Sequence, residues 1–315
     1  MGRNPSELKS FSKRHDLQDA KLFSEYSGVI DYLKGLKDSG SKVCLYIATP
    51  VSTHSPICLS ALDAGINCYC EKPLARDYNE CREVIDKFNA SKEDVRLWVA
   101  YYRRRLPKFQ VVRSNLERLG VITSVSVKLL QKRHMMNEEQ KKHWHFDRAV
   151  SGGGLIMDLG SHIFDLLDHL LGPIENASGV SVRACEDSPG AKDLIEDVVV
   201  GSWSHEGKIL GSCEFNFAAA VNLDEVVISG TRGNLHFVVF NDDLPRFVSA
   251  DGDGVEEDVE FESAGGVQEH VHAPLLADVI KDLIDGTATC PSTGESAARC
   301  NLVLDKLQGR TAWQK

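Results

Sequence analysis

The chain has 315 residues, of which 42% are hydrophobic and 26% are charged, as in a globular protein with room for two domains. Its formal net charge of −10 argues against a nucleic-acid or anionic-membrane partner, because phosphates and acidic lipids repel an acidic surface. The sequence contains no apolar run long enough to span a bilayer, and its first residues lack the apolar core of a signal peptide.

The nine cysteines are scattered along the chain, and none of them forms a C-x-x-C pair. Their odd number and their spacing favour neither a disulfide framework nor a structural zinc site. We therefore expect a protein of a reducing compartment and predict a cytoplasmic location.

The first hundred residues alternate between helical and strand patterns. Helices are predicted at 5–13, 29–36, 55–64 and 78–89, and strands at 20–23, 42–50, 66–73 and 95–102. The run KVCLYIATP at 42–50 is largely apolar, which is typical of a strand that is covered on both faces. Strands that alternate with helices in this way predict βαβ units and a parallel sheet.

The pattern changes after Arg105. A helix is predicted from Pro107 to Gly120 and a half-buried strand at 122–129; another helix follows Gly152. The chain then reads mainly as strands up to about Glu262, and their candidate buried residues are Val198, Val200, Phe215, Phe217, Val227 and Phe237. Helices at 273–285 and 294–307 close the chain. This order predicts a large, mostly antiparallel open sheet with flanking helices.

The segment GGGLIMDLGSH, residues 152–162, contains the strongest candidates for a catalytic or ligand-binding site. Its glycines fit neither the spacing of a dinucleotide fingerprint nor that of a P-loop. In an α-helix, Asp158, His162, Asp165 and His169 would form one column beside the apolar stripe. For Asp165 and His169 we favour a solvated edge.

Asp158 and His162 allow two functional interpretations besides a structural one. A carboxylate one turn from an imidazole fixes its tautomer and raises its basicity, as a general base needs. A metal pair would instead take a third ligand from elsewhere, such as His143 or His145. The spacing alone does not separate these interpretations from a merely polar helix edge.

Polar side chains also follow three of the four strands predicted in the first hundred residues. Lys72 ends one strand, where a cation can stabilise a developing alkoxide. The residues at or just after the other two strand ends are Thr49, Pro50, His54, Tyr101, Tyr102 and Arg103. The carboxyl ends of such strands are where open α/β sheets bind ligands, although a run such as Arg103–Arg105 is more often a solvated turn.

Five segments together resemble the glucose–fructose oxidoreductase/inositol dehydrogenase (Gfo/Idh/MocA) family. They are YIATPVSTH, CEKPLA, AYYRR, GGGLIMDLGSH and CPSTGESAARCN, in an order and spacing that span nearly the whole chain. The resemblance implies a Rossmann-like domain, here residues 1–106, and a substrate-binding and oligomerisation domain, residues 107–315. It also implies a nicotinamide cofactor, a polyol, sugar or related alcohol as substrate, and a homodimer or homotetramer.

The resemblance also implies site residues. The family's Lys, Asp and His triad maps onto Lys72, Asp158 and His162. Its cofactor contacts fall on Thr49, Pro50, His54, Glu71, Lys72 and Pro73, with a cis peptide often found before the proline. Tyr101, Tyr102, Arg103 and His145 are the expected substrate contacts, and no metal is expected.

The start of the chain departs from this family. GRNPSELKSF resembles the segment after the family's second strand, so we expect the Gly-rich turn and its two strands to be missing, and the sheet to begin with an apolar edge. We predict an N-terminally truncated Rossmann-like sheet, which as written binds NAD(P) weakly. Arg3 after the end of strand 2 favours NADP slightly over NAD.

The sequence therefore predicts an oxidoreductase that transfers a hydride between a secondary alcohol and NAD or NADP. Two alternatives stay open. One is a relative that uses bound nicotinamide transiently to cleave glycosides, and the other is an inactive paralogue that acts as a non-catalytic oligomerising subunit.

Overall fold

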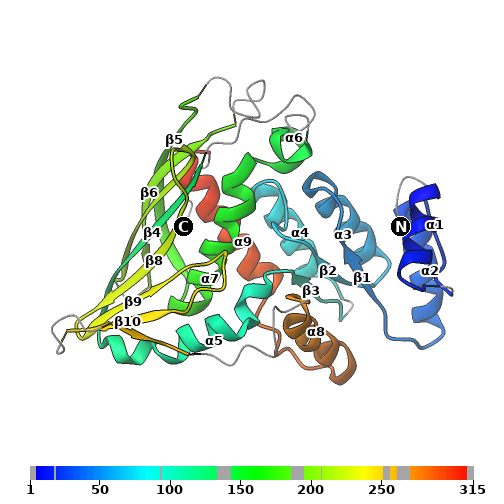
Figure 1. The fold of residues 1–315 in the computed structure, drawn as a ribbon. Coiled ribbons are helices and arrows are strands. Elements are labelled where there is room, and N and C mark those ends of the chain that lie inside the picture. The colour runs from blue at the N-terminus through cyan, green and yellow to red at the C-terminus, as the bar shows by residue number, and fades with distance from the viewer. Residues whose placement is uncertain are drawn as a thin grey trace.

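A computed structural model of the chain describes residues 5–17, 19–92, 94–132, 143–185, 195–206, 208–250, 256–260 and 270–310. The chain forms a three-stranded sheet and an eight-stranded sheet, with helices between them (Figure 1). None of the helices in these ranges combines the length and hydropathy that a membrane crossing needs. The predicted fold class, a Rossmann-like parallel sheet followed by a larger and mostly antiparallel one, is confirmed.

The smaller sheet is parallel and has the order β1-β2-β3. Its strands are β1 (Cys44–Ile47), β2 (Asn67–Cys70) and β3 (Leu97–Val99). The helices of this region are α1 (Pro5–Arg14), α2 (Tyr26–Asp38), α3 (His54–Asp63) and α4 (Tyr78–Ala90). All four helices match predicted ones. The strand predicted at Ala20–Phe23 is wrong: β1 is the edge of the described sheet and is not paired with this segment, in which Leu22 is exposed.

The two faces of β2 and β3 pack against different helices. Cys68, Cys70 and Val99 belong to the main core with α3 and α4. Tyr69 and Trp98 point the other way, into a smaller cluster with Leu275 and Val279 of α8 (Ala273–Asp285). Burial on both faces explains why these strands are apolar without alternation.

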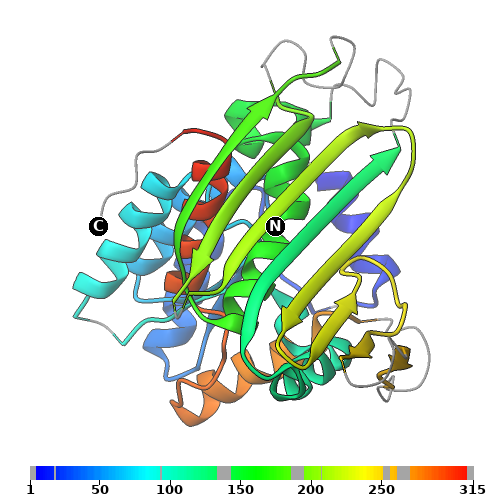
Figure 2. The same ribbon diagram turned by 90° about the vertical axis from the view of Figure 1, so that its left-hand side faces the viewer.

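The larger sheet has the order β11-β10-β9-β8-β4-β7-β6-β5, in which only the β4–β7 pair is parallel. Its strands are β4 (Ile122–Lys132), β5 (Ile174–Val182), β6 (Val198–His205), β7 (Leu210–Ala219), β8 (Leu223–Gly230), β9 (Gly233–Phe237), β10 (Arg246–Ser249) and β11 (Glu256–Asp258). Figure 2 shows this sheet from its open side, with the helices behind it.

One face of the larger sheet is buried and the other is open. Phe215, Phe217 and Phe237 are buried, as predicted. Val200 is 53% exposed, and that part of the prediction is wrong; Val198 and Val227 are only half-buried. Within the run 198–200 the middle residue, Val199, faces the core, so the residues on either side of it face outward.

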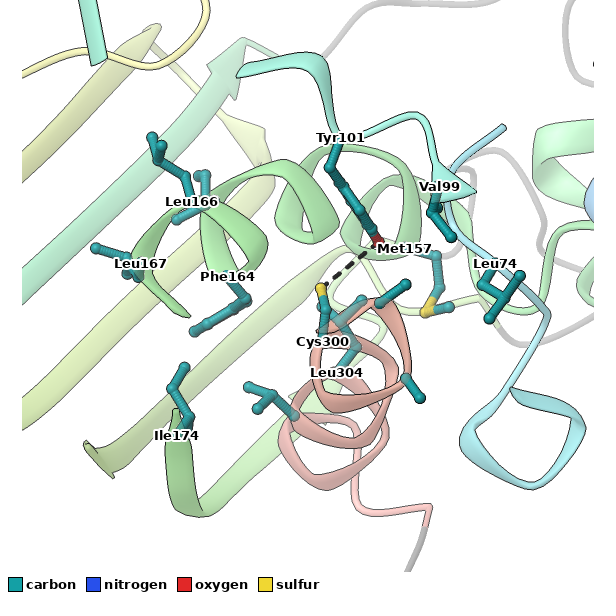
Figure 3. Close-up of a cluster of buried hydrophobic side chains, with 14 of the residues drawn as sticks. Leu74, Val99, Tyr101, Met157, Phe164, Leu166, Leu167, Ile174, Cys300 and Leu304 are labelled. Carbon is teal, nitrogen blue, oxygen red and sulfur yellow. Dashed lines mark hydrogen bonds between the residues drawn. The ribbon is translucent and has the colours of Figure 1, made fainter. Parts of the chain in front are cut away.

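Helices from the second half of the chain join the two sheets. They are α5 (Pro107–Ser114), α6 (Arg148–Ser151), α7 (Ser161–Leu171) and α9 (Gly294–Leu307). The helix predicted from Pro107 to Gly120 is broken, because a 3₁₀ turn at Leu116–Leu119 follows α5. The α9 helix packs against α4 as well as α7 and β5, and its Cys300 and Leu304 share one core with Leu74 and Val99 (Figure 3). The domain boundary between 106 and 107 stays a prediction.

Candidate functional site

A cavity of about 240 Å³ lies at the carboxyl ends of β1 and β2. Thr49, Lys72 and Pro73 line it from the strand ends, and His145 and Asp158 line it from the second half of the chain. The pocket therefore forms where the two regions meet. Its volume suits one ring-sized group, since pockets for larger ligands begin at roughly 300 Å³.

Lys72 and Asp158 form the ion pair of this pocket. Lys72 Nζ lies 2.5 Å from Asp158 Oδ1 and donates a second hydrogen bond of 2.9 Å to the Asp158 carbonyl oxygen. The Lys72–Pro73 peptide bond is cis. The lysine is thus fixed at two points, with its charge directed into the pocket.

The three glycines allow close packing before Asp158. Gly152 has φ 84°, and a Cβ there would lie 2.4 Å from the carbonyl oxygen of Arg76. A Cβ on Gly153 would meet Arg310, and one on Gly154 would meet Ile195 at 2.3 Å. The glycine run therefore lets the chain pass between its neighbours, and its structural role needs no phosphate ligand.

A π-helical turn, Ile156–Gly160, separates the glycines from α7 and contains Asp158. The sequence analysis assumed α-helical spacing, which would place Asp158 beside His162. In the structure Asp158 bonds to Lys72, and His162 Nδ1 is buried without a hydrogen-bond partner among the described residues. The expected Asp158–His162 hydrogen bond is wrong, because the wider turn changes their angular relation.

His162 is only 6% exposed, and its ring lies among aromatic side chains. The ring centroids of Tyr102 and Phe240 are 5.6 Å and 6.1 Å from its own, both edge-on. Burial lowers the pKa of His162 well below its ordinary value, and the charges of Lys72, Arg103 and His272 lower it further. The imidazole is therefore neutral at neutral pH, with Nδ1 unsatisfied.

Tyr102 connects His162 to a second histidine. His272 precedes α8, and its ring centroid is 4.4 Å from that of Tyr102. Its Nδ1 lies 4.0 Å from Glu71 Oε1, which accepts a 2.5 Å hydrogen bond from the Tyr46 hydroxyl. Neither His272 nor Phe240 was identified from the sequence, since both lie outside the strand ends and motifs that were considered.

His54 and Thr49 hold the loops of the pocket together. The two ring nitrogens of His54 lie 3.0 Å and 2.8 Å from the carbonyl oxygens of Pro73 and Thr49, and a neutral imidazole donates its one N–H to either of them. Thr49 Oγ1 accepts a hydrogen bond from Thr53, which also bonds to the Pro50 carbonyl oxygen. His54 thus shapes the predicted cofactor contacts by joining their loops. Arg3 lies outside the described residues.

His145 lines the pocket and stacks on Trp144, with ring centroids 3.7 Å apart. Its Nδ1 is 2.7 Å from that of His143. Burial lowers the pKa of His145, and Asp158 opposes that shift. Within the described ranges no three His, Cys, Asp or Glu residues are grouped so that they could hold a metal ion.

Two expectations for the neighbourhood of His162 are wrong. Tyr101 is fully buried, and its hydroxyl points to Cys300 Sγ, 3.6 Å away (Figure 3), so it has no surface for a substrate to contact. Asp165 was expected on a solvated edge but is 1% exposed. It receives two hydrogen bonds from Arg104, of 2.8 Å and 2.6 Å, which explains how the carboxylate is accommodated in the core.

Two family models match the chain. Residues 3–101 match the model described as an oxidoreductase family with an NAD-binding Rossmann fold. Residues 110–236 match the GFO/IDH/MocA C-terminal domain. The two matches fall on either side of the Tyr102–Arg105 turn.

Curated relatives and solved structures extend these matches. Oxidoreductase P35 of Formosa agariphila is 25% identical over 312 residues, which are 98% of this chain and 89% of that protein. Levoglucosan dehydrogenase of Pseudarthrobacter phenanthrenivorans is 29% identical over 214 residues, 61% of this chain and 54% of that one.

Among solved structures, a levoglucosan dehydrogenase in complex with NADH and levoglucosan has a TM-score of 0.79 at 21% identity, covering 97% of this chain and 85% of its own. An inositol dehydrogenase homologue from Azotobacter vinelandii in complex with NAD⁺ has a TM-score of 0.78 at 18% identity, with coverage of 97% and 87%. At these identities the likeness shows the fold.

Proposed function

Because the chain belongs to the Gfo/Idh/MocA family of NAD-binding oxidoreductases, we propose that it transfers a hydride between a secondary alcohol and a nicotinamide cofactor at the Lys72–Asp158–His162 site. The observation that carries this assignment is the pairing of Lys72 with Asp158 beside a buried, neutral and unsatisfied His162. Lys72 and Asp158 line the pocket at the carboxyl ends of parallel strands, where α/β sheets bind ligands, and the charge of Lys72 acts on His162.

The pocket fits the ring end of a nicotinamide cofactor. It lies between the loop after β1 and the cis Lys72–Pro73 bond, and Thr49 and Pro73 are among the residues that line it. When bound, the nicotinamide ring accepts or donates the hydride. Thr49, Pro50, Glu71 and Pro73 are the residues proposed to hold it, with His54 fixing the two loops.

The protein's own residues accept the substrate hydroxyl proton and stabilise the negative charge that develops on its oxygen. The lowered pKa of His162 keeps its imidazole unprotonated, so it can accept the substrate hydroxyl proton. The Lys72 ammonium, held by Asp158, stabilises the negative charge that develops on the same oxygen. Tyr102, Arg103 and His145 are proposed as substrate contacts, because none of them is fully buried. Tyr102 contacts the His162 ring, Arg103 contacts the Tyr102 ring, and His145 lines the pocket with Lys72 and Asp158.

The substrate proposed is a polyol, a sugar or a related compound. The support comes from relatives whose names specify such compounds, levoglucosan dehydrogenase and 1,5-anhydro-D-fructose reductase. A preference for NADP over NAD rests on Arg3 alone. Comparing the KM values for NADH and NADPH decides it.

The test is cofactor turnover by the full-length protein with levoglucosan, 1,5-anhydro-D-fructose and myo-inositol. We expect a net change in nicotinamide absorbance with at least one of them. His162→Ala and Lys72→Ala should each lower kcat by about 10²–10⁴-fold. His169→Ala is the matched control on the same helix, since its side chain contacts Arg113 away from the pocket.

Three results would contradict this function. His162→Ala with full activity at neutral pH would exclude the proposed base. Product formation without net cofactor turnover would instead indicate transient use of nicotinamide, as in a glycosidase. Failure to bind either cofactor would favour a non-catalytic subunit.

A further inference from the structure

Three consecutive arginines follow β3, and the structure gives them different partners. Arg104 pairs with Asp165 inside the core, and Arg105 pairs with Asp278 of α8 at 2.5 Å. Arg103 forms no ion pair with any described residue. The turn that holds all three is the 3₁₀ segment Tyr102–Arg105, so their different partners reflect the directions in which the side chains point.

Aromatic rings hold the Arg103 guanidinium in place. Its central carbon lies 4.9 Å from the ring centroid of Tyr102 and 4.8 Å from that of Phe240. It donates to the Val239 carbonyl oxygen at 3.3 Å and to the Tyr102 hydroxyl at 2.5 Å. Two of its five N–H groups thus donate to neutral acceptors. The guanidinium is half-buried, and its remaining N–H groups donate to no carboxylate of the described residues.

This cation lies at the proposed catalytic histidine. The two rings that enclose Arg103, those of Tyr102 and Phe240, are also the rings that contact His162 edge-on. The charge of Arg103 is one of the charges that lower the His162 pKa. A group bound by Arg103 would therefore belong to the molecule whose hydroxyl meets His162.

Of the other charges nearby, Lys72 and Glu71 have partners, whereas Asp224 Oδ1 is buried without a hydrogen-bond partner among the described residues. Lys72 is paired with Asp158. Asp224 interacts electrostatically with Arg103, but it accepts hydrogen bonds from the amides of Val239 and Phe240 and also faces the charge of Lys108. Glu71 lies beside His272 and the Tyr46 hydroxyl. Arg103 thus has Asp224 as an electrostatic neighbour, but it forms no ion pair with a carboxylate of the described residues.

We propose that Arg103 binds a carboxylate of the substrate, so that this enzyme acts on a sugar acid, such as a uronate, in preference to a neutral sugar. The inference rests on the proposed function, because it takes the substrate to bind beside His162. A guanidinium presents two parallel N–H groups that match a carboxylate. A single guanidinium near one carboxylate suits a carboxylate monoanion better than a phosphate dianion.

The test compares ligands that differ only in charge. Isothermal titration of the full-length protein, in the presence of NADH, measures the affinity for D-glucuronate and for its neutral isostere D-glucuronamide, and likewise for D-galacturonate and its amide. We expect at least one acid to bind about 10–100-fold more tightly than its amide. Arg103→Gln should abolish this preference and leave the affinity for the amide within about twofold.

Arg105→Gln is the matched control, because it removes the neighbouring arginine that already has a carboxylate partner. Equal affinities for acid and amide, or an equal loss in the two arginine variants, would overturn the inference. Tighter binding of D-glucose 6-phosphate through Arg103 would overturn the choice of a carboxylate. An acid preference without any turnover would support the Arg103 assignment and contradict the proposed function, which keeps the two failures apart.

Discussion

The two sheets bury their apolar strands in different ways. In the parallel sheet, β2 and β3 are covered on both faces, by α3 and α4 on one side and α8 on the other. In the eight-stranded sheet only one face is covered, and Val180, Val182, Val200, Leu210 and Leu223 are exposed on strands of the open sheet (Figure 2). Strands β2 and β3 are thus covered on both faces within one chain, whereas the larger sheet has exposed apolar side chains on its open face.

The site lies between these regions and depends on both. Lys72 follows a strand of the parallel sheet, while Asp158 and His162 belong to the helical segment that packs on the larger sheet. Neither region contains the ion pair alone. Any change that shifts one region against the other should therefore affect the pocket, and the predictions below test how firmly the regions are joined.

The largest effect is expected from Arg104, which links the loop after β3 to α7. Arg104 and Asp165 are 3% and 1% exposed, so Arg104→Met would leave a buried carboxylate without its main partner. We expect the free energy of unfolding to fall by about 3–5 kcal/mol. The half-exposed neighbour serves as the control, since Arg105→Met breaks the Asp278 pair and should cost at most about 1 kcal/mol. Urea denaturation measures both.

A second variant separates the charge from the packing. If the buried carboxylate causes the loss, the double variant Arg104→Met/Asp165→Leu should recover most of the lost stability. Equal losses in Arg104→Met and Arg105→Met would contradict the view that the buried pair joins the two regions.

Some of this site could be predicted from sequence, because strand ends converge wherever the strands are parallel. Lys72, Thr49 and Pro73 follow apolar runs, and they line one pocket. The positions of Asp158 and His162 were identified too, but their geometry was not. That geometry depends on a π-helical turn. A helical pattern of 100° per residue assumes an α-helix and cannot predict such a turn.

Other features depend on contacts between distant segments. Asp165 looks like a surface residue on its helix, because the arginine that accommodates it comes from a turn 61 residues earlier. Phe240 reaches His162 from the segment after β9, and His272 reaches Tyr102 from the start of α8. No local pattern connects such residues, since their proximity follows from the packing of the two regions.

A prediction with an intermediate expected effect concerns the open face of the eight-stranded sheet. We predict that this chain forms a homo-oligomer through the exposed strands β5 and β6. Val200 pairs in register with Val180 on one side and Glu214 on the other. Val200→Lys would gain a cross-strand partner in Glu214, so the monomer should stay folded while a buried charge weakens the interface.

Light scattering over a concentration series should show the dissociation constant rising at least about 10-fold in Val200→Lys. Ile284→Lys changes an equally exposed apolar residue on α8, outside the open face, and should leave the assembly unchanged. A wild-type protein that is monomeric at micromolar concentration would contradict the prediction.

The smallest expected effect concerns pH, and it tests whether His162, buried where the two regions meet, resists protonation in the folded state. Burial and the nearby cations hold the folded pKa of His162 below its unfolded value of about 6.5. As the pH falls below that value, the unfolded chain binds a proton that the folded chain resists, so the free energy of unfolding decreases.

His162→Asn cannot titrate, and it lacks this decrease. The wild type should therefore lose stability relative to His162→Asn between about pH 7.5 and 5.5, by at most about 1.4 kcal/mol per pH unit. Lowered pKa values of His145, His169 and His205 are common to both proteins and cancel in the difference. A difference in unfolding free energy that stays constant over this range would mean that His162 titrates normally in the folded state.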